Sequence, residues 1–228
     1  MTQTQILMYL LIQLGLTIGA LHLITDSLPR CLGQKAKWYL LHCIVNAIVT
    51  LWTASSMLHI LLYPLAKDPY ICFLPVFPSI LVMSLHVYHA LAFHLNRYDI
   101  IHHVVMMLIL LIPLFNTHNA GFIYFCNYSL FYLCGLPGGV DYYMMYKVEC
   151  GQMEKLHEKY YNSHINAWVR SVGILYGAFV CYLKWHLRQV SAVYAVPVIA
   201  AFLWNAQFYN RLVSWSYGYH QAKAELCD

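Results

Sequence analysis

The sequence predicts an all-α polytopic membrane protein with seven transmembrane helices. Its residues are 61% hydrophobic and only 10% charged, and the mean hydropathy is +0.56. A soluble domain carries about 25% charged residues, so a soluble globule of this composition could not cover its surface with polar groups. The charged residues are also clustered, and the tracts between the clusters approach or exceed the roughly 20 apolar residues that span a bilayer.

The seven expected helices follow these uncharged tracts. The tract 100–140 is long enough for two spans, and the polar segment 116–119 is the natural break between them. The segment 147–170 is expected to be the only sizeable polar connection. The expected helices cover residues 5–24, 38–63, 71–94, 100–115, 121–143, 165–183 and 189–213.

Lys and Arg are distributed unequally between the two sides of this arrangement. Seven spans place ten of the 13 Lys and Arg on one side, which the positive-inside rule makes cytosolic. The N-terminus is then lumenal or extracellular, and the C-terminus is cytosolic. Because basic loops beside a membrane explain the net charge of +4, we expect no nucleic-acid partner. The ten are Arg30, Lys35, Lys37, Arg97, Lys147, Lys155, Lys159, Arg170, Arg211 and Lys223, against Lys67, Lys184 and Arg188.

Polar side chains inside the second and third expected helices are candidates to line a binding cavity. His42 and Asn46 are four residues apart on one helical face, and His86 and His89 share a face of the next helix. Buried polar groups in membranes usually face a cavity or the bundle interior. Hydrogen bonding between helices is the alternative for both faces.

The fourth expected helix opens with Asp99, His102 and His103. Asp99 is three and four residues before the two His, so its carboxylate can meet either ring on the helix surface and orient it. Adjacent residues diverge by about 100° around a helix, so only one of the two rings can point straight into the bundle. The alternatives are a helix N-cap for Asp99 and interfacial anchoring for the His pair.

The fifth expected helix contains GLPGGVDYYM, in which Gly135, Pro137, Gly138 and Gly139 argue against a smooth helix. Non-helical backbone at membrane depth is tolerated where it is buried or lines a cavity. Asp141, followed by Tyr142, is therefore a candidate that can converge with the His pair. The alternative is a solvated Asp141 at the cytosolic end of the helix.

The order of these residues resembles the TLC domain family, which includes the ceramide synthases. The chain resembles a divergent member of this family. The stretch 203–220 resembles the family's last span. The residues that match the family's motif are Asp99, His102, His103, Leu108, Asn119, Gly121 and Asp141. The resemblance implies a six-helix bundle at 38–219, preceded by an N-terminal anchor and cytosolic loop at 1–37 and followed by a cytosolic tail at 220–228.

The resemblance also implies an activity on lipids, as an acyl-CoA-dependent N-acyltransferase of the ceramide synthase type in the endoplasmic reticulum or another endomembrane. It implies acyl-CoA as co-substrate, membrane lipids such as a sphingoid base and fatty acyl chains as partners, and no bound cofactor or metal. The oligomeric state stays open. The expected catalytic residues are His102, His103, Asp99 and Asp141. The expected substrate-binding residues are His42, Asn46, His86, His89, Asn119 and Tyr142.

Three alternatives remain at this stage. The first is a non-catalytic lipid-binding, trafficking or membrane-homeostasis protein on the same fold. The second is a membrane metal enzyme with His boxes, suggested by five His within residues 86–103. The third is a seven-helix receptor or retinal protein, although the last expected helix has no Lys at 189–210 for a Schiff base.

Overall fold

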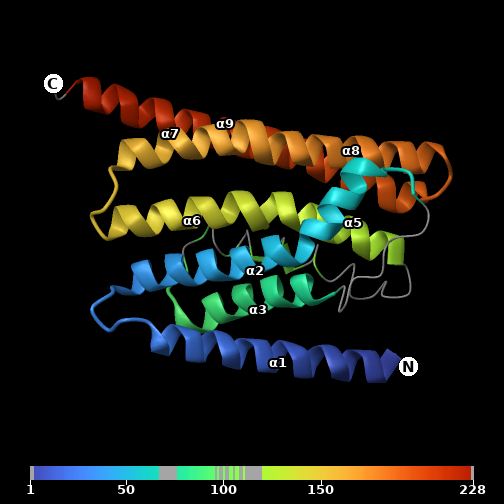
Figure 1. The fold of residues 1–228 in the computed structure, drawn as a ribbon, viewed down its shortest axis with the longest axis horizontal. Coiled ribbons are helices and arrows are strands. Elements are labelled where there is room, and N and C mark those ends of the chain that lie inside the picture. Colours follow the sequence, from blue (N-terminus) through green and yellow to red (C-terminus); the bar gives the residue numbers. More distant parts are fainter. Residues whose placement is uncertain are drawn as a thin grey trace.

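The computed structural model describes residues 3–66, 76–95, 97, 100, 103–104, 106–107, 110 and 120–226. The helices lie mostly along one long axis as an elongated bundle (Figure 1). Within the described part, every regular element is a helix, which confirms the all-α prediction. These are α1 (Gln3–Ser27), α2 (Gln34–Leu62), α3 (Phe77–Ala92), α5 (Ala120–Leu130), η1 (Phe131–Gly135), α6 (Leu136–Glu149), α7 (Lys155–Ile165), η2 (Asn166–Arg170), α8 (Ser171–His186) and α9 (Ala192–Glu225).

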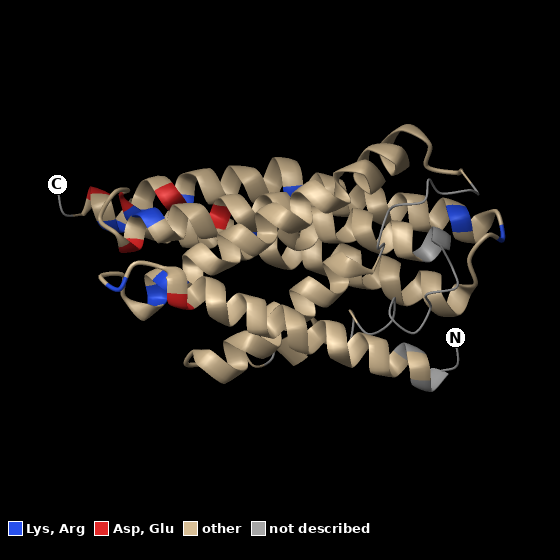
Figure 2. Ribbon diagram, turned by 60° about the horizontal axis from the view of Figure 1, so that its bottom comes forward, with Lys and Arg blue, Asp and Glu red and all other residues tan. Residues whose placement is uncertain are grey.

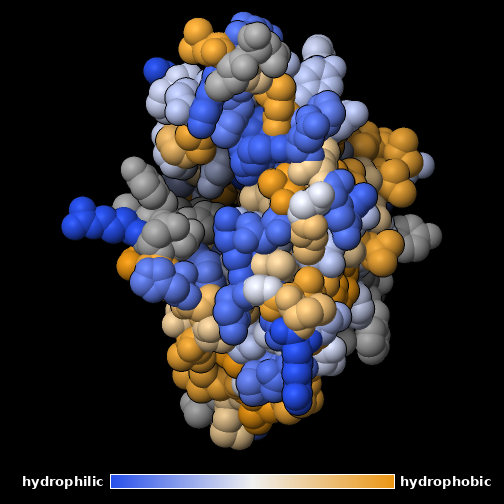
Figure 3. Space-filling view, turned by 90° about the vertical axis from the view of Figure 1, so that its left-hand side faces the viewer, coloured by the Kyte–Doolittle hydropathy of each residue, from blue (hydrophilic) through white to orange (hydrophobic). Residues whose placement is uncertain are grey.

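Three of these helices are long and apolar enough to cross a membrane, namely α1, α2 and α9, and α3 is a shorter apolar helix. Charged residues gather at the end of the bundle that holds the C-terminus, with a smaller group at the opposite end (Figure 2). In the space-filling view of the first of these ends, hydrophilic residues gather in the middle and upper part, and hydrophobic residues lie along the bottom and the right edge (Figure 3). This distribution fits a membrane protein. Most of the expected helix 100–115 lies outside the described residues.

Two long helical runs contain a π-helical turn each. The segments α5, η1 and α6 follow one another without interruption, as do α7, η2 and α8. The expected polar connection 147–170 is therefore wrong for its larger part, since residues from Lys155 onward are helical. Charge alone does not distinguish a loop from a helix that buries its polar groups, and Glu158 of α7 is fully buried.

The GLPGG segment keeps a helical backbone, so the expected non-helical break is replaced by a π turn. The backbone N–H of Leu136 donates to the carbonyl of Phe131, five residues earlier, and Pro137 follows in the first turn of α6. A proline lacks the N–H and clashes with the carbonyl four residues before it, and a locally wider turn accommodates both effects.

The glycines of this segment allow α2 to pack closely on η1 and α6. A Cβ at Gly138 would lie 2.9 Å from Asn46 Nδ2, and one at Gly135 would lie 3.1 Å from Thr50 Oγ1. Small residues bring helix backbones together in membrane bundles, where dispersion contacts carry much of the association. The segment thus serves helix packing.

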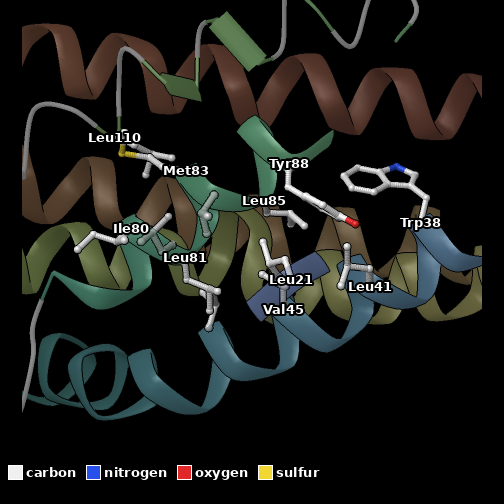
Figure 4. Close-up of a cluster of buried hydrophobic side chains, with 13 residues drawn as sticks. Leu21, Trp38, Leu41, Val45, Ile80, Leu81, Met83, Leu85, Tyr88 and Leu110 are labelled. Carbon is white, nitrogen blue, oxygen red and sulfur yellow. The ribbon is translucent and has the colours of Figure 1, made fainter. Parts of the chain in front are cut away.

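One hydrophobic core joins α1, α2 and α3. Leu21, Leu41 and Leu85 are almost fully buried there (Figure 4). Trp38 and Tyr88 lie at one end of this cluster. The core therefore fixes the relative position of α2 and α3 next to the polar side chains described below.

A second core joins α5, α8 and α9 around Tyr128, which is fully buried. The Tyr128 hydroxyl donates a hydrogen bond of 2.6 Å to the backbone carbonyl of Gly173. At this glycine the ring of Tyr132 occupies the space that a Cβ would need. The absence of a side chain at Gly173 therefore allows α8 to approach the run of α5, η1 and α6 closely.

We expect Gly173→Ala to destabilise the protein by about 1–3 kcal/mol, because the added methyl overpacks the contact with Tyr132. Thermal or denaturant unfolding of the detergent-solubilised protein measures this change. Gly218→Ala in α9 is the matched control, since no atom from beyond the adjoining backbone of its own helix lies within 4 Å of its Cβ position. Equal stability of the two variants would contradict the packing role of Gly173.

Candidate functional site

Four histidines from three segments meet in the bundle interior, and we call them the histidine cluster. His42 belongs to α2, His86 and His89 belong to α3, and His103 follows α3. His89 Nδ1 lies 3.1 Å from His103 Nε2, within hydrogen-bonding distance. The ring centroids of His86 and His103 are 4.7 Å apart. His103 thus lies against both histidines of α3.

Two aromatic residues hold the cluster from the sides. The Trp38 ring stacks on His89 with centroids 3.6 Å apart, and it meets His42 edge-on at 3.8 Å. The Tyr142 ring of α6 stacks on His42 at 4.0 Å. Aromatic stacking restricts ring orientation. The orientation of the imidazole rings is therefore set by residues of α2 and α6 as well as by α3.

The bond between His89 and His103 constrains where protons lie. A hydrogen bond between two imidazole nitrogens needs one N–H donor and one lone-pair acceptor, so these two atoms share a single proton. Either ring can be the donor, because a neutral imidazole carries its proton on one nitrogen or on the other. Such a pair can take up or release a proton at His103 while His89 keeps the ring oriented.

An apolar groove lies beside His103. Its volume is about 360 Å³, and its lining carries few polar atoms apart from those of the two histidines. An apolar groove of this volume suits an alkyl chain, which would lie against the imidazole rings of His86 and His103. The lining residues are His86, Val87, Ala90, Leu95, Ile100, His103, Val104 and Met107.

The structure brings together several residues that the sequence singled out separately. His42, His86, His89 and Tyr142 join His103 in one constellation. Asn46 packs elsewhere, against the glycines of α6.

Three predicted site residues, Asp99, His102 and Asn119, lie outside the described residues. Their roles stay predictions, and so does the pairing of Asp99 with either His of the HH pair.

Asp141 faces a different part of the bundle from its neighbour Tyr142. Its helix α6 also contacts α7 and η2, which carry the charged residues Glu158, Lys159 and Arg170. Neighbouring residues on a helix point about 100° apart, so Tyr142 can meet α2 while Asp141 meets α7. A convergence of Asp141 with the His pair therefore stays a prediction.

Sequence reasoning missed two features of this region. Trp38 reads in the sequence as the first residue of a span, and only its contacts show that it supports the histidines. The residues Glu158, Asn162 and Asn166 are buried inside a segment that was expected to be a polar connection. Their four-residue spacing is the signal that could have found them.

The described residues contain no group of three or more His, Cys, Asp or Glu placed to hold a metal ion. Two imidazole nitrogens at 3.1 Å fit a hydrogen bond, and a metal site needs further converging ligands. The His-box alternative therefore gains no support from the described part of the chain.

Comparisons with known proteins assign no role to the residues of this site. No protein-family model, no curated protein and no solved structure matches this chain.

We expect Trp38→Ala to lower the free energy of unfolding by about 3 kcal/mol, because it removes a buried aromatic side chain from the cluster. Trp38 is 8% exposed, whereas Trp168 is 75% exposed and provides a matched control in Trp168→Ala. Denaturant unfolding of both variants in the same detergent tests this expectation. A loss as large for Trp168→Ala would mean that Trp38 has no special supporting role.

Proposed function

We propose that this chain is a seven-span membrane protein that transfers an acyl group to an amine-bearing lipid, with His103 as the catalytic group. The observation that carries the proposal is the hydrogen-bonded pair His89–His103 beside an apolar groove that His103 itself lines. A proton-accepting imidazole next to a space for an alkyl chain is the arrangement that acyl transfer to a lipid requires.

The helix lengths are compatible with seven spans. Besides α1, α2 and α9, the runs from Ala120 to Glu149 and from Lys155 to His186 each exceed about 30 Å at roughly 1.5 Å per residue. The remaining spans are α3 and the segment that carries His103. With this count the C-terminal end of the bundle is cytosolic, because it collects most of the Lys and Arg.

The proposed reaction uses the groups of the histidine cluster in a defined order. The acyl chain of an acyl-CoA lies in the groove, and the thioester carbonyl comes beside His103. His103 takes a proton from the attacking amine as the N–C bond forms. When the C–S bond breaks, the same proton passes to the leaving thiolate of CoA, and His89 keeps the His103 ring oriented throughout.

The resemblance to the TLC domain family supports this reaction class, since His102 and His103 match its HH pair. In the described part of the chain, His103 joins the cluster. His102 stays a second candidate for the same role. A lipid-binding protein without turnover would use the same groove, and the experiment below separates the two functions.

Activity is measured by incubating the purified protein with labelled acyl-CoA and a panel of amine-bearing lipids. We expect His103→Ala to lower the rate at least about 100-fold, the usual contribution of a general base. His94→Ala is the matched control, because His94 is exposed and lies outside the cluster. Turnover that survives in both His102→Ala and His103→Ala would overturn the mechanism, and bound lipid without any turnover would favour the binding protein.

We expect Ala90→Trp to shift the preferred acyl chain toward shorter lengths, because Ala90 lines the groove and an indole ring would fill part of it. Competition between acyl-CoA substrates of different length measures the preference. Leu91→Trp is the control, since the neighbouring Leu91 is exposed and does not line the groove. An unchanged preference in Ala90→Trp would place the acyl chain outside this groove.

A further inference from the structure

A row of polar residues runs along α7 and η2, away from the histidine cluster. Its members are Glu158, Asn162, Asn166 and Arg170, spaced four residues apart. Glu158 is fully buried and is paired with Lys155 at 3.0 Å and Lys159 at 3.2 Å. The row thus begins at the charged end of the bundle with a buried ion-pair group.

Hydrogen bonds extend this row inward. Asn162 Nδ2 donates to Glu158 Oε1 at 3.5 Å, and Asn166 Nδ2 donates to Asn162 Oδ1 at 2.5 Å. Arg170 closes the row near the midpoint of the helical run from Lys155 to His186, and not at the cytosolic end of the bundle, where the charge count of the sequence placed it. A cationic side chain at half the height of a membrane bundle is costly, and such residues usually mark a binding site or pathway.

Arg170 is held in place from α9. Its Nη2 donates to Asn205 Oδ1 at 3.4 Å, and its guanidinium lies 4.0 Å above the ring of Tyr209. The two π turns η1 and η2 contact each other next to this position. Single π turns inside α-helices occur frequently at functional sites, where they re-aim side chains.

Asp141 belongs to α6 and Arg170 to the turn η2, which contacts α6, yet the two side chains form no direct ion pair within 4.0 Å among the described residues. Asp141 Oδ1 and Arg170 Nε are both buried, and neither has a hydrogen-bond partner in the described part of the chain. One of these atoms is an acceptor and the other is a donor. A buried donor or acceptor that stays unsatisfied destabilises the fold, and the penalty is larger for charged groups.

We propose that Asp141 and Arg170 bind the hydroxyl group of a neutral lipid. A hydroxyl can donate to the carboxylate of Asp141 and accept from the Nε–H of Arg170 at the same time. A phosphate would satisfy Arg170 but be repelled by Asp141, and an ammonium group would satisfy Asp141 but be repelled by Arg170. The position at half the height of the bundle favours a hydroxyl that is carried on an apolar chain.

The test uses the full chain in detergent micelles, with monoolein as the neutral hydroxyl-bearing probe. Binding is followed by ligand-dependent thermal stabilisation and by native mass spectrometry. Methyl oleate has the same acyl chain without hydroxyls, whereas oleylamine and oleoyl phosphatidic acid carry a positive and a negative head. We expect monoolein to bind at least about tenfold more tightly than methyl oleate, as removal of hydrogen bonds to charged groups predicts.

Variants separate a binding pair from a purely structural pair. Arg170→Gln and Asp141→Asn should weaken monoolein binding about tenfold, while Arg211→Gln, which changes an exposed Arg of α9, should not. The double variant Asp141→Leu/Arg170→Met removes both buried charges together, which proteins often tolerate without loss of stability. We expect it to remain folded and to lose monoolein binding.

Several results would overturn the proposal. These are equal binding of methyl oleate and monoolein, tighter binding of either charged lipid, or unchanged monoolein binding in the double variant. Displacement of monoolein by free glycerol would support it and would show that the hydroxyl is recognised without its chain. The site is separate from the histidine cluster, so His94→Ala, which changes an exposed residue outside both regions, should bind monoolein as the unchanged protein does.

Discussion

The helix α2 packs closely on the run η1–α6, and this contact positions the elements around it. Gly135 and Gly138 leave room for Thr50 and Asn46, so the two backbones approach where larger side chains would hold them apart. In a membrane, where lipid is as apolar as the helices, such close contact supplies much of the association energy. The Thr50 hydroxyl turns back to the carbonyl of Asn46 in its own helix, at 2.7 Å. The interface therefore relies on fit between surfaces.

This contact also places the histidine cluster. The same helix pair that meets at the glycines brings His42 of α2 under the ring of Tyr142 of α6, with centroids 4.0 Å apart. Trp38, one turn before His42, then stacks on His89 of α3. The imidazoles are thus oriented by packed aromatic rings from two neighbouring helices. Such rigid support is what a proton-transferring group needs to keep its geometry.

The helix α6 separates two polar regions of different character. On the side of α2 lie neutral aromatic rings and histidines beside an apolar groove. On the side of α7 lie Asp141, Glu158 and Arg170. The charge of Glu158 is balanced by Lys155 and Lys159 at the charged end of the bundle. Adjacent side chains on one helix serve these two regions because they point about 100° apart. A single helix therefore contributes Tyr142 to the histidine cluster and Asp141 to the ionic region.

The all-helical class, the membrane character and the candidate histidines were predictable before folding was considered, because they follow from composition, hydropathy and four-residue spacing. Spacing identifies a shared helical face but not the helix that it meets, so the grouping of His42, His89 and Tyr142 was decided by tertiary packing. The same reason explains the two errors of detail. A proline and glycines suggested broken backbone, where close packing against α2 and a π turn preserve the helix. A polar segment suggested a connection between spans, where residues from Lys155 onward form α7. The four-residue spacing of Glu158, Asn162 and Asn166 is a local signal of one helical face, but only the fold shows that this face is buried.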